Sequence, residues 1–262
     1  MSMSLLADPA LQTVALGAIL LGLVGGVVGA FALLRGQSLL GDALSHAALP
    51  GICAGFLIAG GRQIEALLAG ALVAGVLAAG LVVVISRRSR IRMDAALGIV
   101  LSVSFAVGLV LLTRIQATGG AAQAGLESFL FGQAAAMLRR DLWLMMPVAL
   151  AVLGVVLALW KEFKLVTFDP GFARALGLPV MALDLALTAL IAVAIVLGLQ
   201  MVGVVLMTAM LVAPAAAARQ WTRRLGPMVI LSAGFGAVAG LAGAIVSATA
   251  RGLSTGPLIV LA

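Results

Sequence analysis

The sequence is poor in charge. Only 10% of its 262 residues are charged, whereas 64% are hydrophobic, and the mean hydropathy is +1.27. About a quarter of a soluble globular domain is charged, so this composition excludes an ordinary soluble domain. A membrane-spanning helix needs about 20 apolar residues, and the chain length then allows about eight or nine such helices with their loops. We therefore predict an all-α polytopic membrane protein with about eight transmembrane helices.

Cysteine and lysine are also scarce. Cys53 is the only cysteine, which excludes an intrachain disulfide and a metal site built from paired cysteines. The two lysines, Lys161 and Lys164, lie in WKEF and FKLV, outside any Gly-x-x-x-x-Gly-Lys-Ser/Thr phosphate-binding loop. The zinc-protease motif and the serine-hydrolase elbow are absent too. These absences predict that the chain neither hydrolyses nucleotides nor acts as an intramembrane enzyme.

Basic residues outnumber acidic ones, giving a formal net charge of +7, and all but two of the 16 basic residues are arginine. No run of them is dense enough to bind a nucleic-acid backbone, so we predict no nucleic-acid partner. In membrane proteins, arginine-rich short loops face the cytoplasm. Two loops carry this signal, one with Arg87, Arg88, Arg90 and Arg92, and the other with Arg219, Arg223 and Arg224. Counting membrane crossings from these loops places the N-terminus outside.

Eight apolar stretches are long enough to cross a bilayer. They lie at 11–34, 38–60, 64–86, 94–113, 141–160, 182–199, 201–218 and 226–250. No residue from Ala186 to Ala218 is charged, and one helix of that length would measure about 50 Å, too long for a hydrocarbon core of about 30 Å. We therefore predict a break at Gly198–Gly203.

Glycines spaced four residues apart predict helices in close contact, because small residues let helix backbones approach each other in lipid. Such pairs occur at Gly22/Gly26, Gly25/Gly29 and Gly236/Gly240. We interpret this spacing as helix packing.

The second stretch carries two ionisable residues. Asp42 and His46 are four residues apart, so they share one face of a helix together with Ser38, Leu49 and Cys53. An ionisable side chain inside a membrane helix costs about 2.5–3.5 kcal/mol on insertion scales and usually marks a functional site. His46 is the only histidine in the chain.

A carboxylate and an imidazole one helical turn apart can hold a divalent cation. Two ligands bind weakly alone, but two facing copies of the chain would supply two Asp42 carboxylates and two His46 imidazoles, a set suited to manganese, iron(II) or zinc. From the pair itself, two other interpretations stay open. One is a hydrogen bond that holds helices together, and the other is a proton relay.

The segment 161–181, which the charge count places in the cytoplasm, contains signals for a short helix. Asp169 can cap its N-terminus, Pro170 suits the first helical position, and Gly177 can end it. The pattern predicts about two turns over 170–176, with Phe172 and Leu176 on one face. Such a helix could dock on a cytoplasmic partner or lie on the membrane surface.

Six segments of the sequence resemble the permease subunits of bacterial ATP-binding-cassette importers for manganese, zinc or iron(II), and the resemblance runs nearly end to end. The segments are RGQSLLGDALSHAALPGICAG (35–55), DAALGIVLSVSFAVGLVLLT (94–113), FLFG (129–132), KEFKLVTFDPGFARALGLP (161–179), VGVVLMTAMLVAPAAAAR (202–219) and TGPLIVL (255–261).

This resemblance implies a type II importer with two copies of the permease, two separate ATPase subunits and an extracytoplasmic metal-binding protein. The chain would be a single transmembrane permease domain in the bacterial cytoplasmic membrane, with no permanently bound cofactor. In that family the residues matching Asp42 and His46 coordinate the transported metal. The segment matching 169–178 is the coupling helix that docks into the ATPase, which here comprises Asp169, Pro170, Phe172, Arg174, Leu176 and Gly177.

Two alternative functions belong to other classes of transporter. A permease for metal chelates such as siderophores would need a wide cavity and no metal ligands, so Asp42 and His46 argue against it. An ion-coupled secondary transporter often has inverted repeats with paired broken helices, whereas only the Gly198–Gly203 break is evident. Nothing in the sequence chooses among manganese, zinc and iron.

Overall fold

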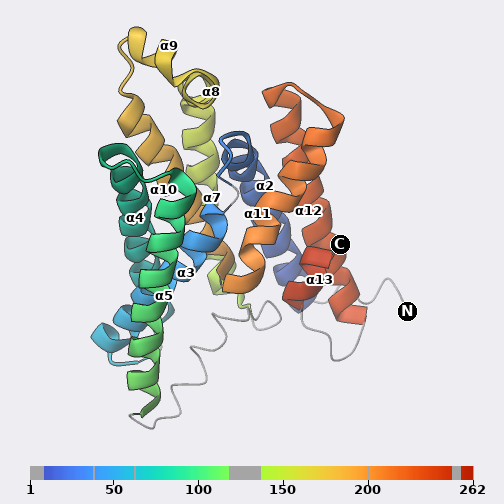
Figure 1. The fold of residues 1–262 in the computed structure, drawn as a ribbon. Helices are drawn as coiled ribbons and strands as arrows, with labels where there is room; N and C mark the ends of the chain where they lie inside the picture. Colours follow the sequence, from blue (N-terminus) through green and yellow to red (C-terminus); the bar gives the residue numbers. More distant parts are fainter. Residues whose placement is uncertain are drawn as a thin grey trace.

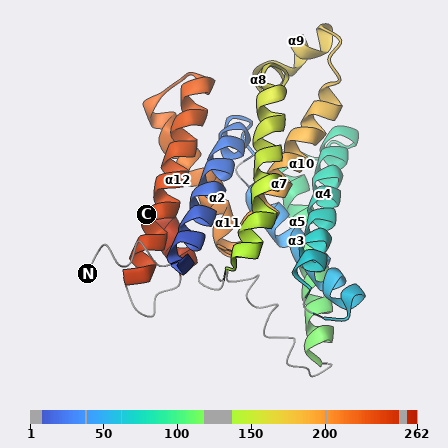
Figure 2. The same cartoon turned by 180° about the vertical axis from the view of Figure 1, so that it is seen from behind.

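The structure is a computed structural model that describes residues 9–37, 39–61, 63–117, 137–199, 201–249 and 255–261. All the regular elements within these ranges are helices, which form one bundle (Figures 1 and 2). They are α2 (Pro9–Leu34), α3 (Leu40–Ala59), α4 (Ile64–Arg88), α5 (Met93–Ala117), α7 (Arg139–Ala158), α8 (Trp160–Phe168), α9 (Pro170–Ala175), α10 (Val180–Leu199), α11 (Val204–Trp221), α12 (Leu225–Thr249) and α13 (Thr255–Leu261).

The predicted membrane spans are confirmed as helices. Within the described residues, seven helices are long and apolar enough to cross a bilayer, namely α2, α3, α4, α5, α7, α10 and α12. The remaining predicted stretch, 201–218, is occupied by α11, which has 18 residues. The chain is therefore an all-α polytopic membrane protein, and eight is an approximate number of spans.

Glycine pairs bring α2 and α12 into backbone contact, as their spacing predicts. A Cβ atom added at Gly22 would collide with the backbone of Gly236, and one at Gly26 would collide with the backbone of Ser232. The Ser232 hydroxyl also donates a hydrogen bond to the Gly26 carbonyl at 2.8 Å. Further along the same contact, Gly240 meets the backbone of Ala18. No side chain fits between the two helices here, so the glycines set their distance.

The predicted break between the sixth and seventh spans is confirmed. Helix α10 ends at Leu199 and α11 begins at Val204. Gly203, the residue before α11, has a φ of +84°, a backbone conformation that side chains other than glycine rarely adopt. This turn lets α10 and α11 share the bilayer as two separate helices.

The segments predicted to face the cytoplasm lie at one end of the bundle. In Figure 1 the end of α2, the α4–α5 turn, the α8–α9 segment and the α11–α12 turn all lie toward the top. This placement agrees with the alternation of crossings deduced from the arginines.

Helix α8 was not predicted, because its sequence, WKEFKLVTF, mixes charged and apolar residues without a clear stop after the fifth span. Its Phe163 is completely buried, with its ring centroid 6.3 Å from that of Phe31 in α2. Trp160 also packs edge-on against Phe31, at 5.8 Å. This aromatic contact anchors the start of the α8–α9 segment to the bundle.

Candidate functional site

Asp42 and His46 lie one turn apart on α3, and the structure brings their side chains together. His46 Nε2 is 3.4 Å from Asp42 Oδ1. The His46 side chain is 22% exposed, and the Asp42 side chain is 39% exposed. The two groups therefore form a pair that is open on one side rather than a buried ion pair.

The rest of this part of α3 is buried. Between Leu40 and Cys53, only Asp42, His46 and Pro50 are partly exposed, and each follows the previous one by four residues. These three residues form the open stripe of α3. In Figures 1 and 2, α3 begins inside the bundle rather than at its upper edge. Ionisable side chains on the one exposed stripe of an otherwise buried membrane helix are typical of residues that line a path through the membrane.

Two residues that helical spacing groups with the pair are covered by α5. Leu49 and Cys53 are buried, since Gly108 of α5 lies against Leu49 and the Cys53 thiol is 3.7 Å from the Gly108 carbonyl oxygen. The open stripe of α3 therefore continues through Pro50 instead of through Leu49 and Cys53. Ser38 lies outside the described residues.

The surroundings of His46 leave one of its nitrogens without a partner among the described residues. Nδ1 is buried and makes no hydrogen bond to any of them, while the ring packs edge-on against Phe105 of α5 at 5.0 Å. An unpaired buried nitrogen is costly, and in a neutral imidazole one nitrogen is an acceptor that can bind a metal. Phe105 fixes the ring from the side, so rotation of the imidazole is restricted.

Asp42 and His46 alone would make only part of a metal site. Among the described residues, no three His, Cys, Asp or Glu side chains gather closely enough to hold a metal ion. Asp42 and His46 could offer one oxygen and one nitrogen ligand, whereas a tetrahedral or larger site needs at least four ligands. The remaining ligands of such a site would come from water, from a second chain or from both.

The predicted short helix in segment 161–181 is present as α9. The Asp169 carboxylate accepts a hydrogen bond from the Phe172 backbone N–H at 2.8 Å, and Pro170 is the first helical residue. Gly177, with a φ of +79°, ends the helix. Phe172 and Leu176 are 53% and 59% exposed, so the bundle leaves their apolar side chains uncovered.

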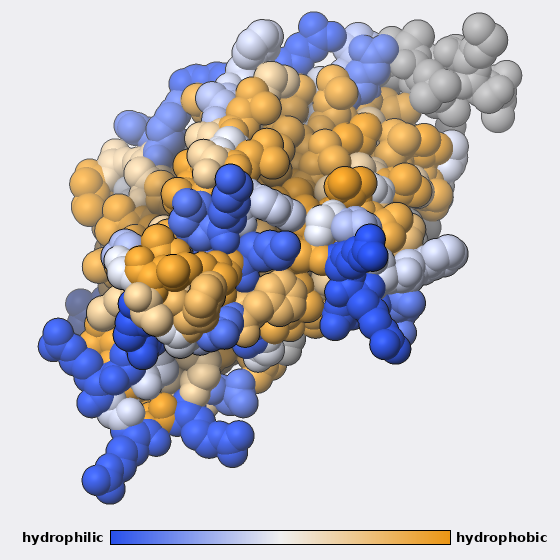
Figure 3. All heavy atoms as spheres, turned by 90° about the horizontal axis from the view of Figure 1, so that it is seen from above, coloured by the Kyte–Doolittle hydropathy of each residue, from blue (hydrophilic) through white to orange (hydrophobic). Residues whose placement is uncertain are grey.

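Arg174 and the other predicted coupling residues lie at the tip of the α8–α9 segment. Arg174 is exposed, whereas Ala173 beside it is completely buried and holds α9 against the bundle. Figure 3 looks onto this end of the molecule, where hydrophilic groups stand in clusters among hydrophobic ones. An exposed, capped helix with two uncovered apolar side chains is a suitable docking element.

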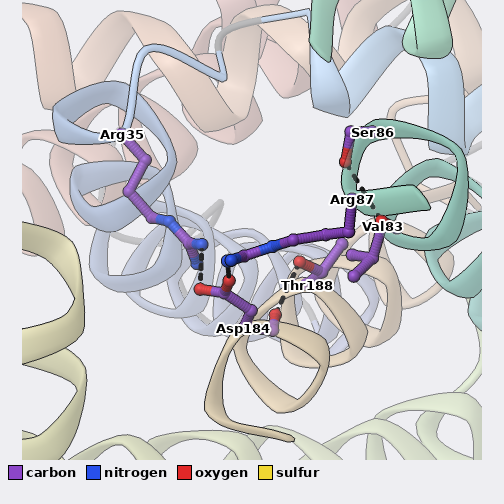
Figure 4. Close-up of polar contacts among 6 residues, drawn as sticks. All are labelled: Arg35, Val83, Ser86, Arg87, Asp184 and Thr188. Atoms are coloured by element: carbon purple, nitrogen blue, oxygen red, sulfur yellow. Dashed lines mark hydrogen bonds and ion pairs between the residues drawn. The ribbon is translucent and has the colours of Figure 1, made fainter. Parts of the chain in front are cut away.

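A charged cluster links three helices at the same end (Figure 4). Asp184 of α10, whose side chain is only 4% exposed, forms ion pairs with Arg35 just after α2 and with Arg87 in the last turn of α4. Burial, and to a smaller extent repulsion from the positive charge of Arg87, lowers the pKa of Arg35 to about 10. The guanidinium therefore stays protonated at neutral pH. Arg35 is 149 residues from Asp184, and no spacing in the sequence indicates their contact.

The comparison with protein families decides where the chain belongs. The model of the ABC 3 transport family matches residues 7–262. The chain belongs to the ABC 3 transport family. This membership confirms the resemblance deduced from the six sequence segments.

Three proteins that are similar to this chain are named as transport proteins for manganese, zinc and chelated iron. The chain is 48% identical to the manganese transport system membrane protein MntC of Bacillus subtilis over 98% of its own length, although it spans only 59% of that protein. It is 48% identical to the zinc transport system membrane protein TroC of Treponema pallidum, covering 99% of this chain and 87% of TroC. It is 37% identical to the chelated iron transport system membrane protein YfeD of Yersinia pestis, covering 97% and 82%.

Solved structures support the fold of this ABC 3 family chain. PsaBC from Streptococcus pneumoniae, solved in complex with a Fab, superposes with a TM-score of 0.85 at 34% identity, covering 100% of this chain and 92% of the other. An inward-facing transporter described as being of the metal-chelate ABC type gives a TM-score of 0.69 at 18% identity, covering 97% and 81%. The second likeness shows the fold alone.

Proposed function

We propose that this protein is the permease subunit of an ATP-driven importer and forms the path of a divalent transition metal through the membrane. The observation that carries the proposal is the open stripe of α3, where Asp42 and His46 lie 3.4 Å apart on a helix that is otherwise buried over residues 40–53. An ion passing this stripe meets a carboxylate and an imidazole, ligands suited to manganese, iron(II) or zinc.

The importer acts as a homodimer of the permease. Each chain contributes one Asp42 and one His46, so two stripes facing each other provide four protein ligands. A site assembled from two chains can also open when the chains move apart, which lets the ion leave. The metal is cargo, and the permease holds no permanent cofactor.

Energy comes from a separate ATPase, present in two copies, that docks on α9. The lack of a phosphate-binding loop in the sequence and the exposure of Phe172 and Leu176 both support this division of labour. An extracytoplasmic metal-binding protein delivers the ion from the other side of the membrane. The permease itself is not an enzyme.

Reconstitution tests the proposed function. The purified permease is placed in liposomes with the ATPase of the proposed importer, and uptake of radioactive manganese, zinc or iron(II) is measured with the metal-loaded binding protein and ATP. We expect ATP-dependent accumulation of at least one bare metal ion. Transport of an iron–siderophore complex without transport of any bare metal would favour a chelate permease, and uptake driven by an ion gradient without ATP would favour a secondary transporter.

Docking on α9 predicts that Phe172→Asp prevents binding of the ATPase. The change places an unpaired charge in an apolar contact, which costs several kcal/mol of association. Co-purification of the ATPase with a tagged permease measures the effect. Trp221→Asp is the matched control, since Trp221 is an exposed aromatic residue at the end of α11, away from α9 (Figure 1), and this variant should retain the ATPase. Equal recovery of ATPase with Phe172→Asp and wild type would place α9 on the lipid surface instead.

The proposed orientation has the N-terminus outside and the α8–α9 segment in the cytoplasm. Single cysteines at two positions, one before α4 and one after it, test this orientation in a chain whose Cys53 has first been changed to Ser. A cysteine at Gly61, before α4, should react with a membrane-impermeant thiol reagent added to intact cells, whereas one at Ser89, after α4, should react only when the cells are opened. The reverse pattern would invert the topology.

A further inference from the structure

A cavity lies beside the Arg35–Asp184–Arg87 cluster, where α4 ends and α5 begins. Its volume is about 360 Å³, and the polar groups that line it belong to Arg35, Gln37, Ser86, Arg87, Arg92, Asp184 and Thr188. In the close-up, Arg35 and Arg87 approach Asp184 from opposite sides (Figure 4). This cavity is separate from the open stripe of α3 and has no role in the proposed metal path.

The charges around the cavity do not balance. Three guanidinium groups, those of Arg35, Arg87 and Arg92, line it, and among the described residues Asp184 is the only carboxylate of the lining. Asp184 is already shared between Arg35 and Arg87. Two positive charges are therefore left without a counter-charge among the residues that line the cavity.

Two buried polar atoms of the lining also lack hydrogen-bond partners within the part of the chain that the structure describes. Arg35 Nη1 is buried and unpaired, although Nη2 of the same guanidinium binds Asp184. Gln37 is only 7% exposed, and its Oε1 is unpaired as well. A buried donor without an acceptor is costly, and an anion in the cavity would satisfy Arg35 Nη1. A half-turn of the Gln37 carboxamide would present its two N–H donors to the same anion, because the oxygen and nitrogen of an amide occupy nearly the same positions.

We propose that this cavity binds the phosphate group of an anionic ligand. Several guanidinium groups around one small space suit a phosphate, whose oxygens accept hydrogen bonds from more than one arginine. Arg35 directly follows the span Leu11–Leu34, and Arg87 closes the span Glu65–Arg88, so the cavity lies at the depth of the lipid headgroups. Basic pockets between membrane helices on the cytoplasmic side bind lipid phosphates. A headgroup phosphate and a free phosphate ion offer the same chemistry, and the experiment below separates them.

Thermal unfolding of the purified permease tests the proposal. The unfolding midpoint is measured in neutral detergent with added phosphatidylglycerol or phosphatidylcholine, and separately with sodium phosphate or sodium chloride at equal ionic strength. A ligand that binds only the folded protein raises the midpoint. We expect phosphatidylglycerol, inorganic phosphate or both to raise it, and phosphatidylcholine and chloride to leave it unchanged.

Arginine variants of the α4–α5 turn give the matched comparison. Arg92→Gln removes a charge from the cavity lining, whereas Arg90→Gln removes a charge two residues away that is also exposed but does not line the cavity. We expect the half-stabilising concentration to rise about fivefold for Arg92→Gln, the effect of one basic residue on an anionic headgroup, and to stay constant for Arg90→Gln. Gln37→Glu, which adds a negative charge to the cavity, should abolish the stabilisation.

The outcomes separate the sources of the phosphate. Stabilisation by phosphatidylglycerol alone identifies a lipid headgroup, and stabilisation by inorganic phosphate identifies a soluble anion. No stabilisation of the wild type by either probe would overturn the proposal, and so would an equal loss in Arg92→Gln and Arg90→Gln. If Arg92→Gln leaves the midpoint shifts intact but weakens ATPase co-purification, the cavity receives an acidic side chain of that protein and the proposal is wrong.

Discussion

Metal uptake should fall to background when His46 is replaced by Gln or Asp42 by Asn, while the permease still inserts and assembles. Both substitutions nearly preserve the size of the side chain and leave an amide oxygen that can accept a hydrogen bond, but each replaces a metal ligand of the proposed path with a neutral amide, which is a weaker ligand. Loss of a group that merely orients a ligand lowers metal affinity by about 10–100-fold, so loss of the ligand itself should cost at least as much. Uptake of radioactive manganese, zinc or iron(II) in cells that lack other importers measures the result.

These variants also separate the three interpretations of the pair. If Asp42 only holds His46 by a hydrogen bond, Asn should replace it and uptake should remain near the wild-type level. If the pair relays protons, uptake should fall while equilibrium dialysis still detects metal bound to the detergent-solubilised permease. Cys53→Ala serves as the control on the same helix, because Cys53 is buried against α5 and lies away from the open stripe of α3. We expect it to transport normally.

Asp184→Ala should destabilise the folded permease by about 3–5 kcal/mol, the usual cost of removing one partner from a buried ion pair. The change would leave Arg35, whose side chain is 11% exposed, without its counter-charge and next to the positive charge of Arg87. It would also disconnect the ends of α2, α4 and α10. The unfolding midpoint of the purified protein in detergent measures the loss, and the yield of folded protein in membranes should fall with it.

The ion pair between Glu65 and Arg140 provides the control for this effect. It also joins two helices, but its side chains are 53% and 75% exposed. Exposed ion pairs contribute about 0–1 kcal/mol, so Glu65→Ala should shift the midpoint only slightly. A midpoint for Asp184→Ala close to that of Glu65→Ala would mean that the buried cluster does not hold the three helices together.

Local signals in the sequence predicted the local parts of this structure. Asp169, Pro170 and Gly177 define the ends of α9 because a cap, a fixed φ and a left-handed turn each act on their own few residues. The four-residue spacing of Asp42 and His46 likewise fixes their side chains on one face of a helix. The predicted break at Gly198–Gly203 follows from length alone, since an uncharged run too long for the bilayer must turn.

Contacts between distant segments could not be predicted in the same way. The pairing of Arg35 with Asp184 depends on how α2 and α10 meet, and no spacing in the sequence encodes that arrangement. The burial of Cys53 depends on where α5 packs, because α5 covers this part of α3. The sequence indicates that this face of α3 is partly polar, but not which helix covers it. The sequence also allows a re-entrant piece within Leu126 to Met137, and residues 126–136 lie outside the described residues.

The glycine contact between α2 and α12 reverses the usual result of an alanine scan. In most helical proteins, replacing a large core residue by alanine is harmful, and replacing a glycine within a helix by alanine is mild or helpful. At Gly22, Gly26 and Gly236, one added methyl group would meet the backbone of the facing helix, which cannot rotate away as a side chain can. Replacing one of these glycines by alanine adds a single methyl group, yet it should be among the most damaging substitutions in this chain. A set of alanine variants that leaves out the glycines would miss the positions where the two helices are joined.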